Sequence, residues 1–115
     1  MHRSSILLFG SDTNVLHSRQ LVLQNCGYEA RFTSRIDEAE QLLRAGSIDL
    51  LVLCHTASSE DCDYFLDTVA GLERHVKVLV LLSGPRGCSY VDRHAVIDVM
   101  DGPGRFVATV NELVA

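Results

Sequence analysis

The chain has 115 residues, 47% of them hydrophobic, so it can build one hydrophobic core and is too short for two typical domains. Lys and Arg total 10 against 15 Asp and Glu, and the formal net charge of −5 opposes binding to a nucleic-acid backbone. No apolar run reaches the ~18 residues needed to cross a bilayer, and the N-terminus lacks a signal-peptide cleavage pattern. We therefore predict one soluble, cytoplasmic domain over residues 1–115, without a nucleic-acid or membrane partner. Its initial Met1 and the lack of a tail lead us to expect a complete product.

Apolar runs of strand length alternate with segments of helical period, which indicates βα units around a parallel sheet that is buried on both faces. Residues 6–9 form a continuous apolar run, typical of a central strand. The Gly-Ser-Asp sequence at 10–12 predicts a turn into a helix that starts near Thr13 and stops at Gly27.

The second βα unit has a weaker apolar pattern than the first. Residues 28–33 alternate enough to predict a partly exposed strand. Ser34 and Asp37 then resemble a capping box that opens a helix through Ala45, and Gly46 ends that helix.

The third unit begins with a uniformly apolar run at 50–54, which predicts another central strand. Its helix follows the polar stretch 55–59, and we read the acidic residues at 60–63 as the negative charge that a helix N-terminus favours. Residues 76–82 are predicted to be the fourth strand.

The last third of the chain is the least regular. Residues 83–87 are too rich in Gly and Pro for a helix, so the fourth crossover helix must be short, within 89–94. A fifth strand is predicted at 96–99, and the residues at 101–104 should turn into a final amphipathic helix.

Several segments of this pattern are shared with one family of small α/β domains. They are the hydrophobic first strand, the Asn-Cys-Gly-Tyr-Glu turn at 25–29, the Glu38-Ala39 pair and the entry to the third strand at 48–53. On these segments the whole chain resembles response-regulator receiver (CheY-like) domains. The resemblance implies a flavodoxin-like, doubly wound α/β/α sandwich. Its five-stranded parallel sheet would have the order 2-1-3-4-5, here with a short or irregular fourth helix, and its ligands would gather at the carboxyl ends of strands 1 and 3.

A working receiver needs acidic side chains after its first strand, because Mg²⁺ prefers oxygen ligands and must neutralise the transferring phosphoryl group. The resemblance places this acidic pair on Gly10 and Ser11, and neither residue can supply a carboxylate. Asp12 is the acid that remains in this loop. We favour an N-cap role for Asp12, with metal binding as the alternative, and we predict no metal site and no cofactor.

The phosphoacceptor position has also changed. The resemblance places it five residues after Asp49, on Cys54, and a thiol cannot form an acyl phosphate. The adjacent His55 could carry a phosphoryl group, although a lone His at a strand end is more typical of a surface or hydrogen-bonding role.

Three further family positions lie after the fourth strand. The hydroxyl residue matches Ser83 and is retained, whereas the Lys falls on Gly102 and the switch aromatic on Val99. We therefore predict a degenerate receiver without catalytic residues. Its former phosphorylation pocket consists of Gly10, Ser11, Asp12, Cys54, Ser83 and Gly102.

Cys54 also motivates a hypothesis from another class, a thiol redox or small-ligand sensor. Such a sensor would use the pocket at the carboxyl ends of strands 1 and 3, around Asp12, Cys54 and Ser83. However, the four cysteines show no CxxC or zinc-ribbon spacing, and Cys commonly packs as a small hydrophobe. Reduced, structural thiols are the simpler expectation.

Protein binding is the leading hypothesis. Receivers commonly pair through the face made by helix 4, strand 5 and helix 5, and aromatic and Arg side chains suit an interface. A solvated surface with a half-buried aromatic is the open alternative for this face. The chain is thus expected to be a phosphorylation-independent interaction module in signal transduction, whose partner is either another signalling protein or a second copy of itself. The expected interaction face comprises Tyr90, Arg93, Val99, Arg105 and Phe106.

Overall fold

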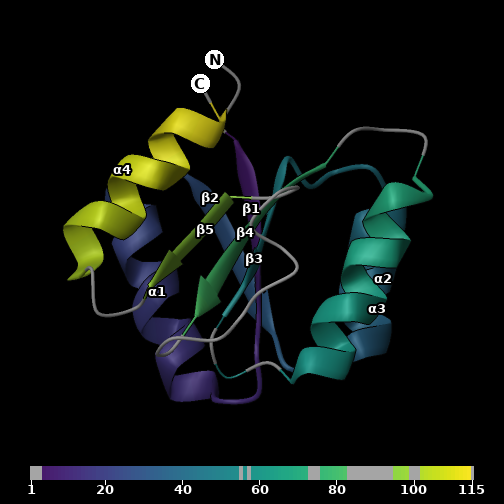
Figure 1. Cartoon of the computed structure of the whole chain (residues 1–115). Helices are drawn as coiled ribbons and strands as arrows, with labels where there is room; N and C mark the ends of the chain where they lie inside the picture. Colours follow the sequence, from purple (N-terminus) through teal and green to yellow (C-terminus); the bar gives the residue numbers. More distant parts are fainter. Residues whose placement is uncertain are drawn as a thin grey trace.

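Parallel strands form one sheet whose two faces are covered by helices (Figure 1). The structure is a computed structural model that describes residues 4–54, 56, 58–72, 76–82, 95–98 and 102–114. The strand order is β2-β1-β3-β4-β5, and each neighbouring pair is parallel. The strands are β1 (Ser5–Phe9), β2 (Glu29–Thr33), β3 (Leu50–Leu53), β4 (Lys77–Leu82) and β5 (Ala95–Asp98). The helices are α1 (Thr13–Asn25), α2 (Ile36–Arg44), α3 (Ser59–Ala70) and α4 (Gly102–Val114).

The sheet separates two apolar cores, as a doubly wound fold requires. Figure 1 shows α1 and α4 on one face of the sheet and α2 and α3 on the other. Leu8, Leu16 and Phe106 belong to the core under α1 and α4, whereas Leu7 and Phe65 belong to the core under α2 and α3. The predicted α/β class with a parallel sheet is therefore confirmed.

The central strands owe their position to uninterrupted apolar sequence. Every residue of Leu50–Leu53 is buried, as are residues 6–9 of β1. The edge strand β2 instead alternates between exposed and buried residues. This contrast follows from the requirement that a central strand be covered on both faces.

Helix ends agree with the sequence at some positions and differ at others. Gly27 and Gly46 follow α1 and α2 with φ of +92° and +77°, in the left-handed region that glycine adopts readily. The predicted capping box of Ser34 and Asp37 was wrong, because Arg35 is the N-cap and makes no side-chain cap bond. The hydroxyl of Thr33 instead accepts a hydrogen bond from the Arg35 N–H at 3.0 Å.

The last helix begins earlier than predicted. Gly102 and Pro103, expected in the preceding turn, are the first residues of α4. Pro is tolerated in a first helical turn, where its missing N–H would have no partner in the helix, and Gly102 keeps the turn-like φ of +86°. The predicted short helix at 89–94 lies outside the described residues.

Candidate functional site

The loops after β1 and β3 lie next to each other at the carboxyl edge of the sheet. Phe9 and Leu53 are paired in register, so Gly10 and Cys54 leave the sheet side by side. The Cys54 N–H donates to the Phe9 carbonyl at 2.9 Å. This edge is where open α/β sheets bind ligands, and it holds the predicted residues Gly10, Ser11, Asp12 and Cys54.

Thr56 joins these two loops. Its Oγ1 accepts a hydrogen bond from the Ser11 N–H at 3.1 Å and another from the Asp12 N–H at 3.4 Å. In the reverse direction, the Ser11 hydroxyl donates to the Thr56 carbonyl at 2.7 Å. The backbone donors of Ser11 and Asp12 are therefore used in hydrogen bonds within the protein.

Gly10 makes room for Thr56. A Cβ at position 10 would lie 2.5 Å from Thr56 Oγ1 and 3.2 Å from Cys54 Cβ, and real Cβ atoms essentially never approach another heavy atom as closely as 2.5 Å. A carboxylate side chain thus has no space at this position unless Thr56 moves. Glycine at position 10 therefore permits the close packing of Thr56 and Cys54 against this loop.

Asp12 caps α1, as favoured from the sequence. One carboxylate oxygen, Oδ1, accepts from the Asn14 N–H at 3.0 Å and from the Val15 N–H at 3.4 Å. These bonds satisfy amides that have no partner within the helix. Within the described ranges, no group of three or more His, Cys, Asp and Glu side chains could hold a metal ion.

Cys54 is buried, with 1% of its surface exposed, and it belongs to the core under α1 and α4. Burial raises the pKa of its thiol to about 12, and the nearby Arg19 guanidinium opposes this rise only in part. The thiol is therefore protonated at neutral pH, whereas the thiolate is the reactive form. His55 and Ser83 lie outside the described residues.

Arg19 is a site residue that the sequence reasoning missed. It projects from α1, and the charge of its guanidinium lowers the pKa of the Cys54 thiol, against the larger effect of burial. A signal was present, since Arg19 lies three residues after Leu16 and four before Leu23, the two buried leucines of this helix. At this spacing a cation shares the buried face of the helix.

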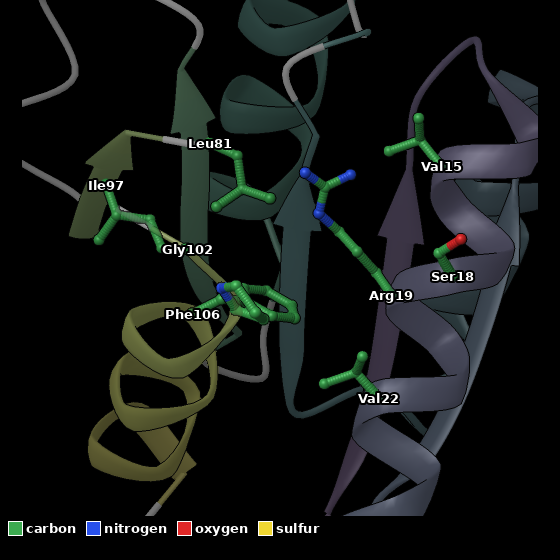
Figure 2. A pocket seen from close by; sticks show the side chains of 9 residues that line it. Val15, Ser18, Arg19, Val22, Leu81, Ile97, Gly102 and Phe106 are labelled. Atoms are coloured by element: carbon green, nitrogen blue, oxygen red, sulfur yellow. The ribbon is translucent and has the colours of Figure 1, made fainter. Parts of the chain in front are cut away.

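A cavity of about 300 Å³ lies between α1 and α4, beside Arg19. Figure 2 shows the Arg19 side chain crossing this space, with α1 residues on one side and Leu81, Ile97 and Phe106 on the other. Gly102, which the sequence assigned to the former phosphorylation pocket, lines this cavity. The described lining residues are Val15, Ser18, Arg19, Val22, Leu81, Ile97, Gly102, Pro103 and Phe106.

The predicted interaction face is described only in part. Tyr90, Arg93 and Val99 lie outside the described residues, and Arg105 is exposed on α4. Phe106 is 5% exposed and packs in the core, so its assignment to a partner surface was wrong. Its position follows from α4 packing this side of the helix against the sheet.

No protein-family model and no curated protein matches the sequence. Solved structures do match. A signal receiver domain of an HD domain-containing protein from Pseudomonas fluorescens Pf-5 has a TM-score of 0.83 at 17% identity, covering 98% of this chain and 95% of that one. A receiver domain (CheY-like) from Methylobacillus flagellatus has a TM-score of 0.81 at 8% identity, with 97% and 99% covered.

A receiver domain protein from Bacillus halodurans C-125 is similar in the same way, with a TM-score of 0.78 at 16% identity and 97% of each chain covered. These similarities show that the chain has the fold of response-regulator receiver domains. Among the helices that the structure describes, none is long and apolar enough to cross a membrane.

Proposed function

We propose that this chain is a phosphorylation-independent protein-interaction module in signal transduction, built on the receiver fold. The observation that carries the proposal is the Thr56 contact with the first loop, in the space that a side chain at position 10 would need. In this proposal the chain is not an enzyme, needs no metal or cofactor, and acts in the cytoplasm.

The side chains at the site support this proposal through their chemistry. Phosphoryl transfer to a receiver requires a carboxylate that attacks phosphorus and a cation that neutralises charge. Cys54 offers a buried, protonated thiol at the attacking position. The Asp12 oxygen that accepts from the helix amides is already engaged, and Gly10 has no room for an acid.

The partner in this proposal is a protein, and a second copy of the chain is the first to test. The surface we assign to it is the predicted face of Tyr90, Arg93, Val99 and Arg105, without the buried Phe106. Arg105 supplies a described and exposed guanidinium at the start of α4. Arg is among the residues that most often anchor protein interfaces.

Nuclear magnetic resonance provides the test. Amide spectra of the ¹⁵N-labelled chain are recorded alone, with Mg²⁺, and with Mg²⁺ plus beryllofluoride, a phosphoryl-group analogue. We expect unchanged amide shifts for Ser11, Cys54 and Thr56, and an unchanged mass by light scattering in all three samples. A conventional receiver treated identically is the positive control. Saturable shifts at these residues, or an oligomer that forms only with beryllofluoride, would contradict the proposal.

A second candidate function, small-ligand sensing, is favoured by the cavity between α1 and α4. The sequence had placed the ligand pocket at the ends of strands 1 and 3, where Thr56 now occupies the space beside Gly10. The raised pKa of the Cys54 thiol argues against thiol redox sensing, because it disfavours the reactive thiolate.

A further inference from the structure

The cavity between α1 and α4 is walled mainly by apolar side chains. Val15 and Val22 line it from α1, whereas Leu81, Ile97 and Phe106 line it from β4, β5 and α4 (Figure 2). The two valines are half-buried, and the other three residues are buried. The walls thus offer aliphatic and aromatic surface, as the walls of ligand pockets characteristically do.

The two polar side chains that the structure describes in this lining, Ser18 and Arg19, are both engaged within the protein. The Ser18 hydroxyl donates a hydrogen bond to the Asn14 carbonyl at 3.1 Å. The Arg19 guanidinium has an interaction of its own inside the protein, and its Nη1 atom is fully buried. Neither side chain therefore supplies a free donor to a ligand.

This lining favours a ligand without charge. A guanidinium keeps its positive charge at neutral pH, so Arg19 repels a cationic ligand. An anionic ligand would lose its water without gaining a free side-chain donor from the described lining residues, and burying an unpaired charge is costly. A neutral apolar molecule avoids both costs, because its contact with apolar walls needs no polar partner.

The volume limits the size of this molecule. The cavity has a volume of about 300 Å³. An apolar cavity of about 150 Å³ holds benzene, and ligand pockets start at about 300 Å³. A substituted aromatic ring or a branched hydrocarbon of similar size therefore fits, and the Phe106 ring offers an aromatic ligand a tilted or stacked contact.

We propose that this cavity binds a small, neutral, apolar molecule of the size of a substituted benzene, held between α1 and α4 by burial of its apolar surface. The proposal rests on the small-ligand candidate function and names the class of its ligand. It goes beyond protein interaction, and it does not depend on whether the chain is phosphorylated.

Three probes of similar size test the class of ligand. Toluene is neutral, benzoate is an anion and benzylammonium is a cation at neutral pH. The ¹⁵N-labelled chain is titrated with each probe at the same pH and ionic strength, and its amide shifts are followed. Toluene should saturate with a dissociation constant on the order of 1 mM, with the largest shifts at Ser18, Val22 and Phe106. Both charged probes should bind at least about tenfold more weakly.

A variant that fills the cavity locates the site. Val22→Phe enlarges a side chain of the lining and should weaken toluene binding at least about tenfold, because the ring takes the space of the ligand. Leu21→Phe is the matched control. It enlarges the neighbouring side chain on α1, which is 48% exposed and is not among the lining residues, and should leave the affinity for toluene unchanged.

The same titrations can overturn the proposal. It fails if toluene does not saturate below its limit of solubility, if a charged probe binds as tightly as toluene, or if Val22→Phe binds toluene as tightly as Leu21→Phe does. Should Val22→Phe not fold, the comparison of the three probes and the position of the shifts in the unaltered chain still decide.

These outcomes separate the ligand class from the functions on which it bears. If only a charged probe saturates, with shifts at the same residues, the cavity is a ligand site and the neutral class is wrong. If no probe binds, the small-ligand candidate function fails together with the proposal. The beryllofluoride experiment tests the protein-interaction function separately, through the shifts of Ser11, Cys54 and Thr56.

Discussion

Ser11 and Thr56 hold together the loops that follow two neighbouring strands. The Ser11 N–H donates to Thr56 Oγ1 at 3.1 Å, and the Ser11 hydroxyl donates to the Thr56 carbonyl at 2.7 Å. The residues are 45 positions apart in the sequence. Their contact places a threonine in the space beside Gly10. At the edge of the sheet where this fold binds ligands, the two loops are therefore hydrogen-bonded to each other.

The first prediction concerns the room that Gly10 leaves. Gly10→Ala should lower the free energy of unfolding by about 1–3 kcal/mol, because the new Cβ would force Thr56 away from its donors. Urea denaturation measures this change. Gly104→Ala is the matched control, since no heavy atom lies within 4 Å of a Cβ there and alanine favours a helix by roughly 0.5–1 kcal/mol.

The contact with Thr56 can be isolated with a double-mutant cycle. In a Thr56→Ala background, which lacks Oγ1, the loss of stability caused by Gly10→Ala should become smaller. An equal loss in both backgrounds would mean that Thr56 is not the group that excludes a side chain at position 10.

The second prediction concerns Asp12. Asp12→Ala should destabilise the fold by about 1 kcal/mol, because the amides of Asn14 and Val15 lose their acceptor, whereas Asp12→Asn retains one. Thermal or urea unfolding, with and without Mg²⁺, gives the comparison. If Mg²⁺ stabilises the unaltered chain and not the Asn variant, Asp12 is a metal ligand and the cap assignment fails.

The third prediction concerns thiol reactivity. Cys26 is exposed and Cys54 is buried with a pKa raised to about 12, so iodoacetamide at pH 8 should modify Cys26 well before Cys54. Peptide mass mapping during the reaction separates the two rates. Modification of Cys54 as fast as Cys26 in the folded chain would revive the redox hypothesis.

The same thiol should affect stability at alkaline pH. Because its folded pKa lies above its unfolded value of 9.0, the unfolded chain releases this proton first. Below about pH 9 the thiol is protonated in both states, and its contribution to the free energy of unfolding is fully present. This contribution is lost as the pH rises towards about 12. Denaturation at several pH values should show a steeper alkaline loss in the unaltered chain than in Cys54→Ala.

The fourth prediction distinguishes core from surface on α4. Phe106→Ala should cost about 3–5 kcal/mol, because it empties a buried site, whereas Arg105→Ala should change stability by less than about 0.5 kcal/mol. Chemical denaturation of both variants tests this contrast. A stable Phe106→Ala variant that loses self-association would instead restore Phe106 to the interaction face.

The architecture was predictable because its signals are local. Uniform burial of Leu50–Leu53 follows from a purely apolar run, and Gly27 ends α1 through a backbone conformation that glycine adopts readily. The start of α2 was missed because the hydroxyl of Thr33, rather than that of Ser34, accepts a hydrogen bond from the Arg35 N–H near the helix start. Such competition between neighbouring hydroxyls depends on geometry that the sequence does not contain.

The candidate site was less predictable because its decisive contacts are not local. The cap by Asp12 could be inferred from its position before a helix. Thr56 could not, since its bonds to Ser11 depend on how two distant loops meet. Arg19 carried a usable signal as a cation on the buried face of α1, but its effect on the pKa of the Cys54 thiol required the folded chain.

The central claim, that this receiver fold works without phosphorylation, is tested most directly by intact-protein mass spectrometry after incubation with acetyl phosphate and Mg²⁺. A conventional receiver in the same buffer serves as the positive control. We predict that the mass stays that of the unmodified chain while the control acquires a phosphoryl group. A phosphoryl adduct on this chain, removed by hydroxylamine as an acyl phosphate would be, would contradict the account and reveal a phosphoacceptor other than Cys54.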